Sequence, residues 1–124
     1  MTRLQDTDLR LAPMTAADVD EVWALECSVF PYPWSRGNFA DAVASGYDCW
    51  TVRDPDGELA GYYLLMYALD EAHLLDVAVA GKRQRQGLGR RLLDEIAARA
   101  RGQGMESILL EVRPSNERAL DVYR

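Results

Sequence analysis

The sequence has few of the residues on which disulfide-bonded and metal-binding proteins depend. Among 124 residues there are only two cysteines, Cys27 and Cys49, and one histidine, His73. Two cysteines make neither a disulfide framework nor a set of metal ligands, and no Ser/His/Asp triad can be assigned around the single histidine. We therefore expect a reduced, cytoplasmic protein with no metal site. Both cysteines stand in apolar surroundings without a nearby histidine, which predicts inert burial.

Long hydrophobic runs are also missing. No apolar run approaches the length needed to span a membrane, and residues 1–6 lack the apolar core of a signal peptide. We expect no membrane partner. The length of 124 residues fits a single domain, residues 1–124, and a hydrophobic content of 48% can supply its core.

The net charge of −6 hides an asymmetry along the chain. Residues 1–81 hold four basic and fourteen acidic side chains, a balance of −10, whereas residues 82–124 hold ten and six, a balance of +4. The second part favours a polyanionic cofactor, and the first favours a cationic partner such as an amine or a basic peptide end. Solubility alone would also explain the acidic part. The positive charge is concentrated around one loop and its helix, so we expect no direct contact with nucleic acid.

Hydrophobic periodicity and turn residues predict elements in the order β-α-α-β-β-β-α-β-α. Asp54–Gly57 reads as a tight turn between two strands, and the two prolines of residues 31–34 exclude regular helix there. The predicted strands cover residues 9–13, 49–53, 59–68, about 73–79 and 107–112, with a link at 69–71; the predicted helices cover about 15–30, 35–44, 88–101 and a segment beginning at 114.

The most informative stretch joins a strand to a helix. The strand ends at Val79, and Gly87 and Gly89 stand where a strongly amphipathic helix begins. Main-chain N–H groups in a first helical turn have no internal acceptor and carry the positive end of the helix dipole. The pattern predicts a cradle for a diphosphate, formed by Arg85, Gln86, Gly87, Leu88, Gly89 and Arg90. Positive side chains surround it: Lys82, Arg83, Arg85, Arg90 and Arg91.

Two common phosphate-binding loops do not fit this stretch. A P-loop requires Gly-Lys-Ser/Thr, but Gly89 is followed by two arginines. A dinucleotide-binding loop requires a third glycine, where this chain has Leu92. The remaining pattern, Gln/Arg-x-x-Gly-x-Gly/Ala, resembles the acetyl-CoA signature of the GNAT superfamily of N-acetyltransferases. A glycine-rich loop that only caps a surface helix is the alternative.

The resemblance extends over nearly the whole chain and implies an α/β (α+β) fold with a mixed central sheet flanked by helices. It implies acetyl-CoA as co-substrate, with Val77, Ala78 and Val79 offering main-chain groups to the pantetheine arm. The family's last two strands are absent from this sequence, so we expect an incomplete acceptor site and an uncovered sheet edge through which the protein could self-associate.

A second resemblance lies in the C-terminal run from Leu110 to Tyr123. It is similar to the Glu-Val-Arg-x-Ser-Asn…Tyr motif of the RimI-like acetyltransferases, which acetylate the N-terminal alanine of a ribosomal protein. By that resemblance Glu111 is the general base and Tyr123 the general acid. Asn116 caps the last helix, contacts the cofactor, or does both.

The stretch Tyr32-Pro33-Trp34 followed by serine resembles the segment that borders the acceptor site in this family. Read without the resemblance, it is a packed connection between helices. The sequence thus predicts an N-terminal protein acetyltransferase that acts on a ribosomal-protein peptide. The alternatives are acetylation of a small-molecule amine and a non-catalytic acyl-CoA-binding module.

Overall fold

The structure, a computed structural model, describes residues 9–110 and consists of one five-stranded sheet covered by helices on both faces. The strands follow the order β1-β2-β3-β4-β5, in which β1 to β4 pair antiparallel and β5 pairs parallel to β4. The elements are β1 (Arg10–Pro13), the 3-10 turn η1 (Ala16–Asp18), α2 (Val19–Val29), α3 (Arg36–Ala44), β2 (Asp48–Arg53), β3 (Leu59–Ala68), β4 (Glu71–Val79), η2 (Gly81–Arg83), α4 (Leu88–Gly102) and β5 (Ser107–Leu110).

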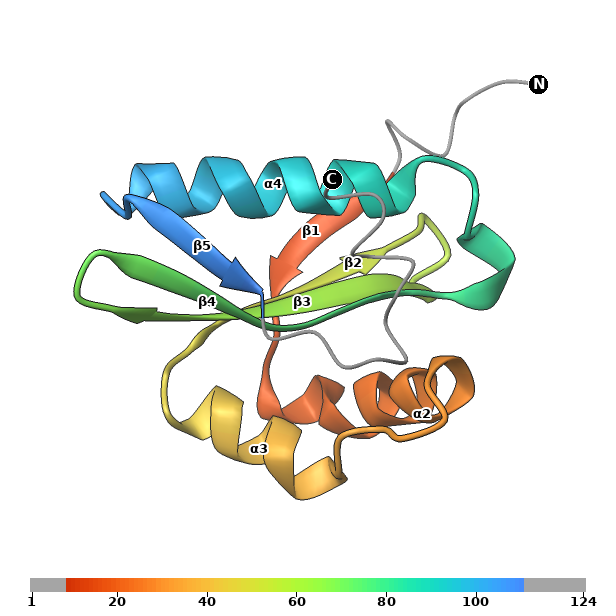
Figure 1. The fold of residues 1–124 in the computed structure, drawn as a ribbon. Coiled ribbons are helices and arrows are strands. Elements are labelled where there is room, and N and C mark those ends of the chain that lie inside the picture. The colour runs from red at the N-terminus through yellow and green to blue at the C-terminus, as the bar shows by residue number, and fades with distance from the viewer. Residues whose placement is uncertain (1–8, 111–124) are drawn as a thin grey trace.

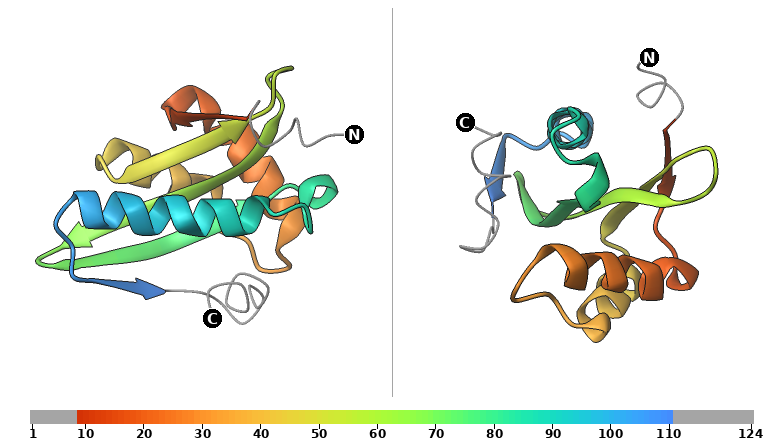
Figure 2. Two further views of the ribbon diagram at one scale, coloured as in Figure 1. Left: turned by 90° about the horizontal axis from the view of Figure 1, so that it is seen from above. Right: turned by 90° about the vertical axis from the view of Figure 1, so that its right-hand side faces the viewer.

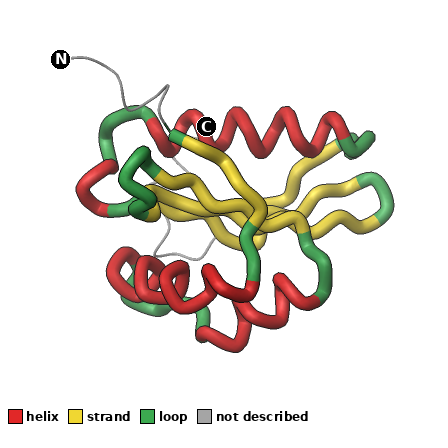
Figure 3. Tube along the Cα trace, turned by 180° about the vertical axis from the view of Figure 1, so that it is seen from behind, coloured by secondary structure: helices red, strands yellow, loops and turns green. Residues whose placement is uncertain are grey.

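The molecule has three layers. Helix α4 lies on one face of the sheet, and α2 and α3 lie on the other (Figure 1, and from behind in Figure 3). Viewed from above, β5 lies at the outer edge of the sheet beside β4 (Figure 2). The predicted order of elements is confirmed over the described residues, and so is the mixed sheet.

Strand β3 forms the centre of both core layers. Tyr62 and Leu64 pack with the residues of α2 and α3, whereas Tyr63 and Leu65 pack beneath α4. All four side chains have no exposed surface, because alternate residues of a strand face opposite sides and both sides are covered. A continuous apolar strand in the sequence is therefore buried on both faces.

Helix α2 buries an acidic residue together with its apolar ones. Its buried residues are Val19, Val22 and Glu26, which share one side of the helix, while Trp23 is 38% exposed. Cys27 lies one turn after Trp23 and is exposed, so the expectation that both cysteines are buried is wrong for Cys27. The apolar residues of α2 do not all follow one stripe, and the carboxylate of Glu26 occupies a core position.

The connections carry the local signals seen in the sequence. Ser35 Oγ accepts a hydrogen bond from the Asn38 N–H (3.1 Å), which caps α3 as predicted. Residues 31–34, called the aromatic loop below, join α2 to α3 without helical structure. The predicted Asp54–Gly57 turn is present, with Gly57 at a positive φ of 87°. The expected link at 69–71 is one residue too long, because Ala68 already pairs with Glu71 across a two-residue turn.

The close packing of β3 on β4 depends on Gly61. A Cβ at this position would lie 2.7 Å from the Ala78 carbonyl oxygen and 3.3 Å from Leu92 Cδ1 of α4. The first distance is shorter than van der Waals contact, and a main-chain oxygen held in a sheet cannot easily retreat. Any side chain here would push β3 away from β4 or from α4.

We expect Gly61→Ala to lower the free energy of unfolding by about 1–3 kcal/mol, because the added methyl group overpacks the junction of β3, β4 and α4. Gly102→Ala is the matched control, since a Cβ at that exposed helix end meets no atom within 4 Å. Urea unfolding of the three proteins measures the difference. Equal midpoints for wild type and Gly61→Ala would contradict the packing argument.

Candidate functional site

The junction between β4 and α4 has the geometry that the sequence predicted. Gly87 is the N-cap of α4 with φ 88°, and its carbonyl accepts the first helical hydrogen bond from the Arg91 N–H (3.1 Å). The N–H groups of Leu88, Gly89 and Arg90 therefore have no acceptor within the helix. No acidic residue stands in this first turn. A dianionic diphosphate fits such a helix end, because the N–H groups and the helix dipole both favour negative charge.

Two glutamines hold the glycine loop, residues 84–90, in shape. Gln84 Nε2 donates to the Val79 carbonyl oxygen and Gln86 Nε2 donates to the Lys82 carbonyl oxygen, each at 3.1 Å. Arg85 between them has a positive φ of 67°, an uncommon conformation for a residue with a side chain. The sequence singled out Gln86 as a main-chain contact but not Gln84, whose role depends on the end of β4 lying next to it.

Two of the cations expected around this loop serve the fold instead. Lys82 Nζ lies 2.7 Å from Glu58 and Arg83 lies 2.9 Å from Asp54, so both connect η2 to the turn between β2 and β3. Arg83 and Asp54 are largely buried, which leaves neither group free for a ligand. The charge next to the glycine loop is therefore smaller than the sequence suggests, and Arg85 and Arg90 are exposed.

Asp54 is the centre of this connection. Its Oδ1 accepts hydrogen bonds from the Glu58 and Asp56 N–H groups, each at 2.9 Å, and its Oδ2 accepts from Arg83. The Glu58 N–H, the Arg83 guanidinium and the Asp56 N–H lower the pKa of the Asp54 carboxyl, since each favours its charged form. The β2–β3 turn thus holds η2 in place just before the glycine loop.

Strand β4 offers main-chain groups next to that loop. Ala80 N–H donates to the Ala60 carbonyl at 2.8 Å. Hydrogen-bonded pairs alternate in an antiparallel ladder, so Ala78 also directs its main chain toward β3, whereas Val77 and Val79 direct theirs to the opposite edge.

Strand β5 covers only the first part of that opposite edge. It pairs with Glu71 to Leu74 of β4, and beyond Leu74 no strand within residues 9–110 covers the edge. The pairing of β3 with β4 shifts by one residue at the same place, between Leu64 and Leu65. The Val77 N–H is met by Asp76 Oδ1 (2.9 Å) and the Val79 carbonyl by Gln84. Two main-chain groups of this edge are thus already hydrogen-bonded to side chains, and an extended chain such as a pantetheine arm could pair with the others.

The aromatic loop lies on the α2–α3 side of the sheet. Tyr32 is 78% exposed, and Trp34 is half-buried with its ring 5.0 Å from that of Phe39. Trp34 packs in the same core cluster as Ala78 of β4. The structure therefore brings the predicted acceptor segment into the same layer as the predicted pantetheine segment.

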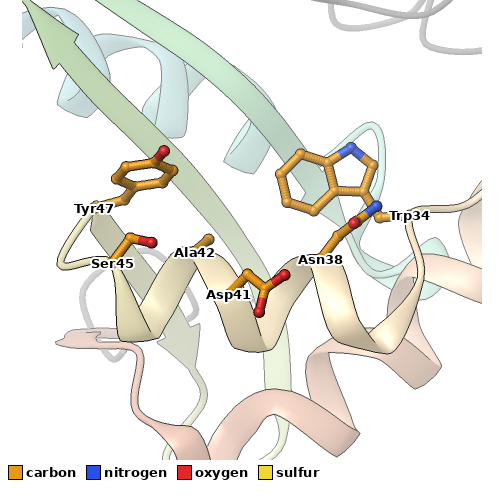
Figure 4. Close-up of a pocket in the computed structure, with 6 residues that line it drawn as sticks. All are labelled: Trp34, Asn38, Asp41, Ala42, Ser45 and Tyr47. Carbon is orange, nitrogen blue, oxygen red and sulfur yellow. The ribbon is translucent and has the colours of Figure 1, made fainter.

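An open groove of about 320 Å³ runs from the aromatic loop along α3 (Figure 4). Trp34 and Tyr47 stand at its two ends, with the carboxylate of Asp41 between them. The groove is lined by Trp34, Asn38, Asp41, Ala42, Ser45 and Tyr47. A carboxylate between two aromatic rings can accommodate a cationic group.

The remaining candidates play other parts. Glu111, Asn116 and Tyr123 lie outside the described residues. Cys49 is buried, and that burial, followed by the charge of Asp48, raises the pKa of its thiol to about 12, so it remains protonated at neutral pH. Within residues 9–110 no group of His, Cys, Asp or Glu side chains could hold a metal ion. In the same part of the chain, no helix is both long and apolar enough to cross a bilayer.

Comparison with known proteins identifies relatives over most of the chain. The model of the acetyltransferase (GNAT) family matches residues 19–124. The [ribosomal protein bS18]-alanine N-acetyltransferase of Escherichia coli K12 is 31% identical over 113 residues, which cover 91% of this chain and 76% of the relative. A putative enzyme of the same description from Bacillus subtilis is 30% identical over 112 residues, covering 90% and 74%.

Solved structures give the same result. The crystal structure of the ribosomal-protein-S18-alanine N-acetyltransferase from Escherichia coli superimposes with a TM-score of 0.82 at 30% identity, covering 93% of this chain and 74% of that one. Ard1 from Thermoplasma volcanium superimposes with a TM-score of 0.79 at 22% identity over 94% and 79%, which shows a shared fold.

The connection between Asp54 and Arg83 makes stability depend on pH. A carboxyl whose pKa is lowered by folding contributes stability above its unfolded value, about 3.9, and loses it as the pH falls through the folded value. We expect Asp54→Asn to be less stable than wild type at pH 7, with the difference shrinking as the pH falls below about 4.

Thermal unfolding between pH 7 and pH 2.5 measures this difference. Asp56→Asn, in the same turn but exposed, is the control and should follow the wild-type curve. A constant difference between wild type and Asp54→Asn at every pH would show that the charged form of Asp54 makes no contribution.

Proposed function

We propose that this chain acetylates the α-amine of an N-terminal alanine on a ribosomal protein. The chain belongs to the GNAT acetyltransferase family and is an acetyl-CoA-dependent N-acetyltransferase. The observation that carries the proposal is the 31% identity to the Escherichia coli ribosomal-protein-alanine enzyme over 91% of this chain. The substrate would then be the N-terminal peptide of a protein.

The described residues suit acetyl-CoA. We assign its pyrophosphate to the main-chain N–H groups of Arg85, Gln86, Gly87, Leu88, Gly89 and Arg90, where the helix end is positive and free of acidic side chains. We assign the pantetheine arm to Val77, Ala78 and Val79, because Val77 and Val79, on either side of Ala78, turn their main-chain groups away from β3 to the uncovered edge. Asn116 is a further proposed contact, by its match to the family motif.

The chemistry we propose needs only a mild base. A free α-amine has a pKa of about 8, so a carboxylate can remove its proton near neutral pH. Glu111 would accept that proton as the amine nitrogen attacks the thioester carbonyl carbon. When the carbon–sulfur bond breaks, Tyr123 would protonate the leaving thiolate, and the products are the N-acetyl peptide and coenzyme A. Tyr32, Pro33 and Trp34 would contact the peptide.

A small-molecule amine is the competing substrate class. An aminoglycoside acetyltransferase from a soil metagenomic sample superimposes on this chain with a TM-score of 0.72, but at 21% identity this shows a shared fold alone. The carboxylate of Asp41 in the groove could attract an amine of either substrate class. Mass spectrometry after incubation with acetyl-CoA decides between them: acetylation of an alanine peptide supports our proposal, and exclusive acetylation of aminoglycosides contradicts it.

We expect Gly89→Glu to lose acetyl-CoA binding without losing stability. A Cβ at Gly89 meets only Val79 Cγ2, at 3.9 Å, so the fold has room for it. A carboxylate in the first turn favours the helix but repels a pyrophosphate at the same N–H groups. Calorimetric titration with acetyl-CoA and thermal unfolding measure the two effects.

Gly89→Ala is the control for Gly89→Glu, since it adds bulk without charge. Gly87→Glu should also abolish binding, but the positive φ of Gly87 adds strain, so it is the less direct variant. Unchanged acetyl-CoA affinity in Gly89→Glu would refute the assignment of the glycine loop.

We expect Glu111→Gln to lower kcat by about 100-fold or more, in the range of a lost general base. The affinity for acetyl-CoA should stay near wild type, because the substitution preserves shape and removes only the proton acceptor. Steady-state kinetics with an alanine peptide across pH 6 to 9 measures this. A wild-type turnover and pH profile in Glu111→Gln would exclude Glu111 as the base.

A further inference from the structure

One carboxylate in the core of the α2–α3 layer, that of Glu26, has no part in the function proposed above. Glu26 has no exposed surface, although the other acids of α2, Asp20 and Glu21, face solvent. Burial of a carboxylate costs free energy unless donors replace the water that it loses. The contacts of Glu26 therefore indicate why an acid occupies a core position of this helix.

The two carboxylate oxygens of Glu26 reach two different parts of the site. Oε2 accepts a hydrogen bond from the Trp34 N–H in the aromatic loop, at 2.9 Å. Oε1 accepts one from the Tyr62 hydroxyl in β3, at 2.5 Å. Hydrogen bonds to a charged acceptor are stronger than neutral ones, so this carboxylate ties the loop firmly to the sheet.

A second route joins the same two residues. The Trp34 ring lies 5.0 Å from the Phe39 ring, which lies 5.8 Å from the Tyr62 ring in an edge-to-face arrangement. Trp34, Phe39, Tyr62 and Glu26 thus form a closed circuit of contacts around the base of the aromatic loop. Tyr62 in turn pairs with Ala78, at the centre of the β4 segment assigned to pantetheine.

We propose that Glu26 is a positioning residue, which sets the aromatic loop relative to β4 and thereby the peptide amine relative to the acetyl group. This inference rests on the proposed function in one respect, that the aromatic loop contacts the acceptor peptide. It adds a residue that lies in the middle of α2, outside every motif of the glycine loop or the C-terminal run.

Glu26→Ala, Glu26→Gln and Tyr62→Phe test the inference. Glu26→Ala should raise the KM for an N-terminal alanine peptide about tenfold, the scale of one strong hydrogen bond, and leave acetyl-CoA affinity within about twofold. Glu26→Gln should restore most of the peptide affinity, because its oxygen can accept from Trp34 while the Tyr62 hydroxyl turns to accept from its amide. Tyr62→Phe breaks the link to β3 and should also raise the peptide KM.

Val22→Ala is the matched control. Val22 is fully buried one turn before Glu26 on the same face of α2, so its truncation weakens the packing of the helix but removes no hydrogen bond to the aromatic loop. An equal rise of the peptide KM in Val22→Ala and Glu26→Ala would overturn the inference. An unchanged peptide KM in both Glu26→Ala and Tyr62→Phe would overturn it too, and Tyr62→Phe alone decides if Glu26→Ala does not fold.

Hydrogen exchange separates this inference from the proposed function. The Trp34 amide should exchange faster in Glu26→Ala and Tyr62→Phe than in wild type, while the Ala80 amide, bonded to Ala60, should not change. If wild type acetylates no alanine peptide, the proposed function fails, and this exchange measurement still decides whether Glu26 holds the loop. Unaltered Trp34 exchange in both variants would overturn the inference.

Discussion

At any position, each edge of a β-strand can form hydrogen bonds with only one neighbouring strand. The two edges of β4 differ in how far along the strand they are paired. One edge pairs with β3 throughout, while the other pairs with β5 only from Glu71 to Leu74. The register shift opposite Leu64 and Leu65 falls at the end of that β5 pairing. Without this shift, the main-chain groups after Leu74 would alternate between the two edges of β4 in the same phase as those before it. The open edge at Val77 and Val79, on which the cofactor assignment depends, follows from this single constraint.

The glycine loop owes its position to contacts made by the neighbouring β2–β3 turn, at the same end of the sheet. Arg83 binds Asp54 and Lys82 binds Glu58, so the β2–β3 turn fixes η2 before the loop begins. Gln84 then fastens the loop to the Val79 carbonyl. The segment before Gly87 is therefore held in place by contacts with the rest of the protein. Less conformational entropy is then lost when an anionic ligand binds at this helix end.

Local signals in the sequence predicted more of this structure than distant ones. The Ser35 cap, the Asp54–Gly57 turn and the strand–loop–helix junction at Gly87 each depend on residues a few positions apart, and all three are present. The burial of Glu26 could not be read locally, because its partner Tyr62 lies 36 positions away. An acid in the middle of a helix usually faces solvent, so nothing local in α2 indicates that Glu26 is buried. Of the predicted site, Glu111, Asn116 and Tyr123 lie outside the described residues and stay predictions.

In the folded protein, the charge asymmetry of the chain serves mainly to form ion pairs between its two parts. The acidic excess of residues 1–81 suggested attraction for a cationic substrate, yet many of these acids are bound within the protein. Asp54, Glu58 and Asp48 pair with Arg83, Lys82 and Arg99, all from the basic part of the chain. Others pair within the acidic part, as Arg53 does with Asp18 and Glu21. Opposite charges in the two parts thus hold β2 and its turn against η2 and α4. A substrate amine is therefore attracted by a smaller number of acids, such as Asp41, which lines the groove on α3. Since exposed charges are screened over about 10 Å at 0.1 M salt, the selection of a substrate depends on where these few acids lie and not on the net charge.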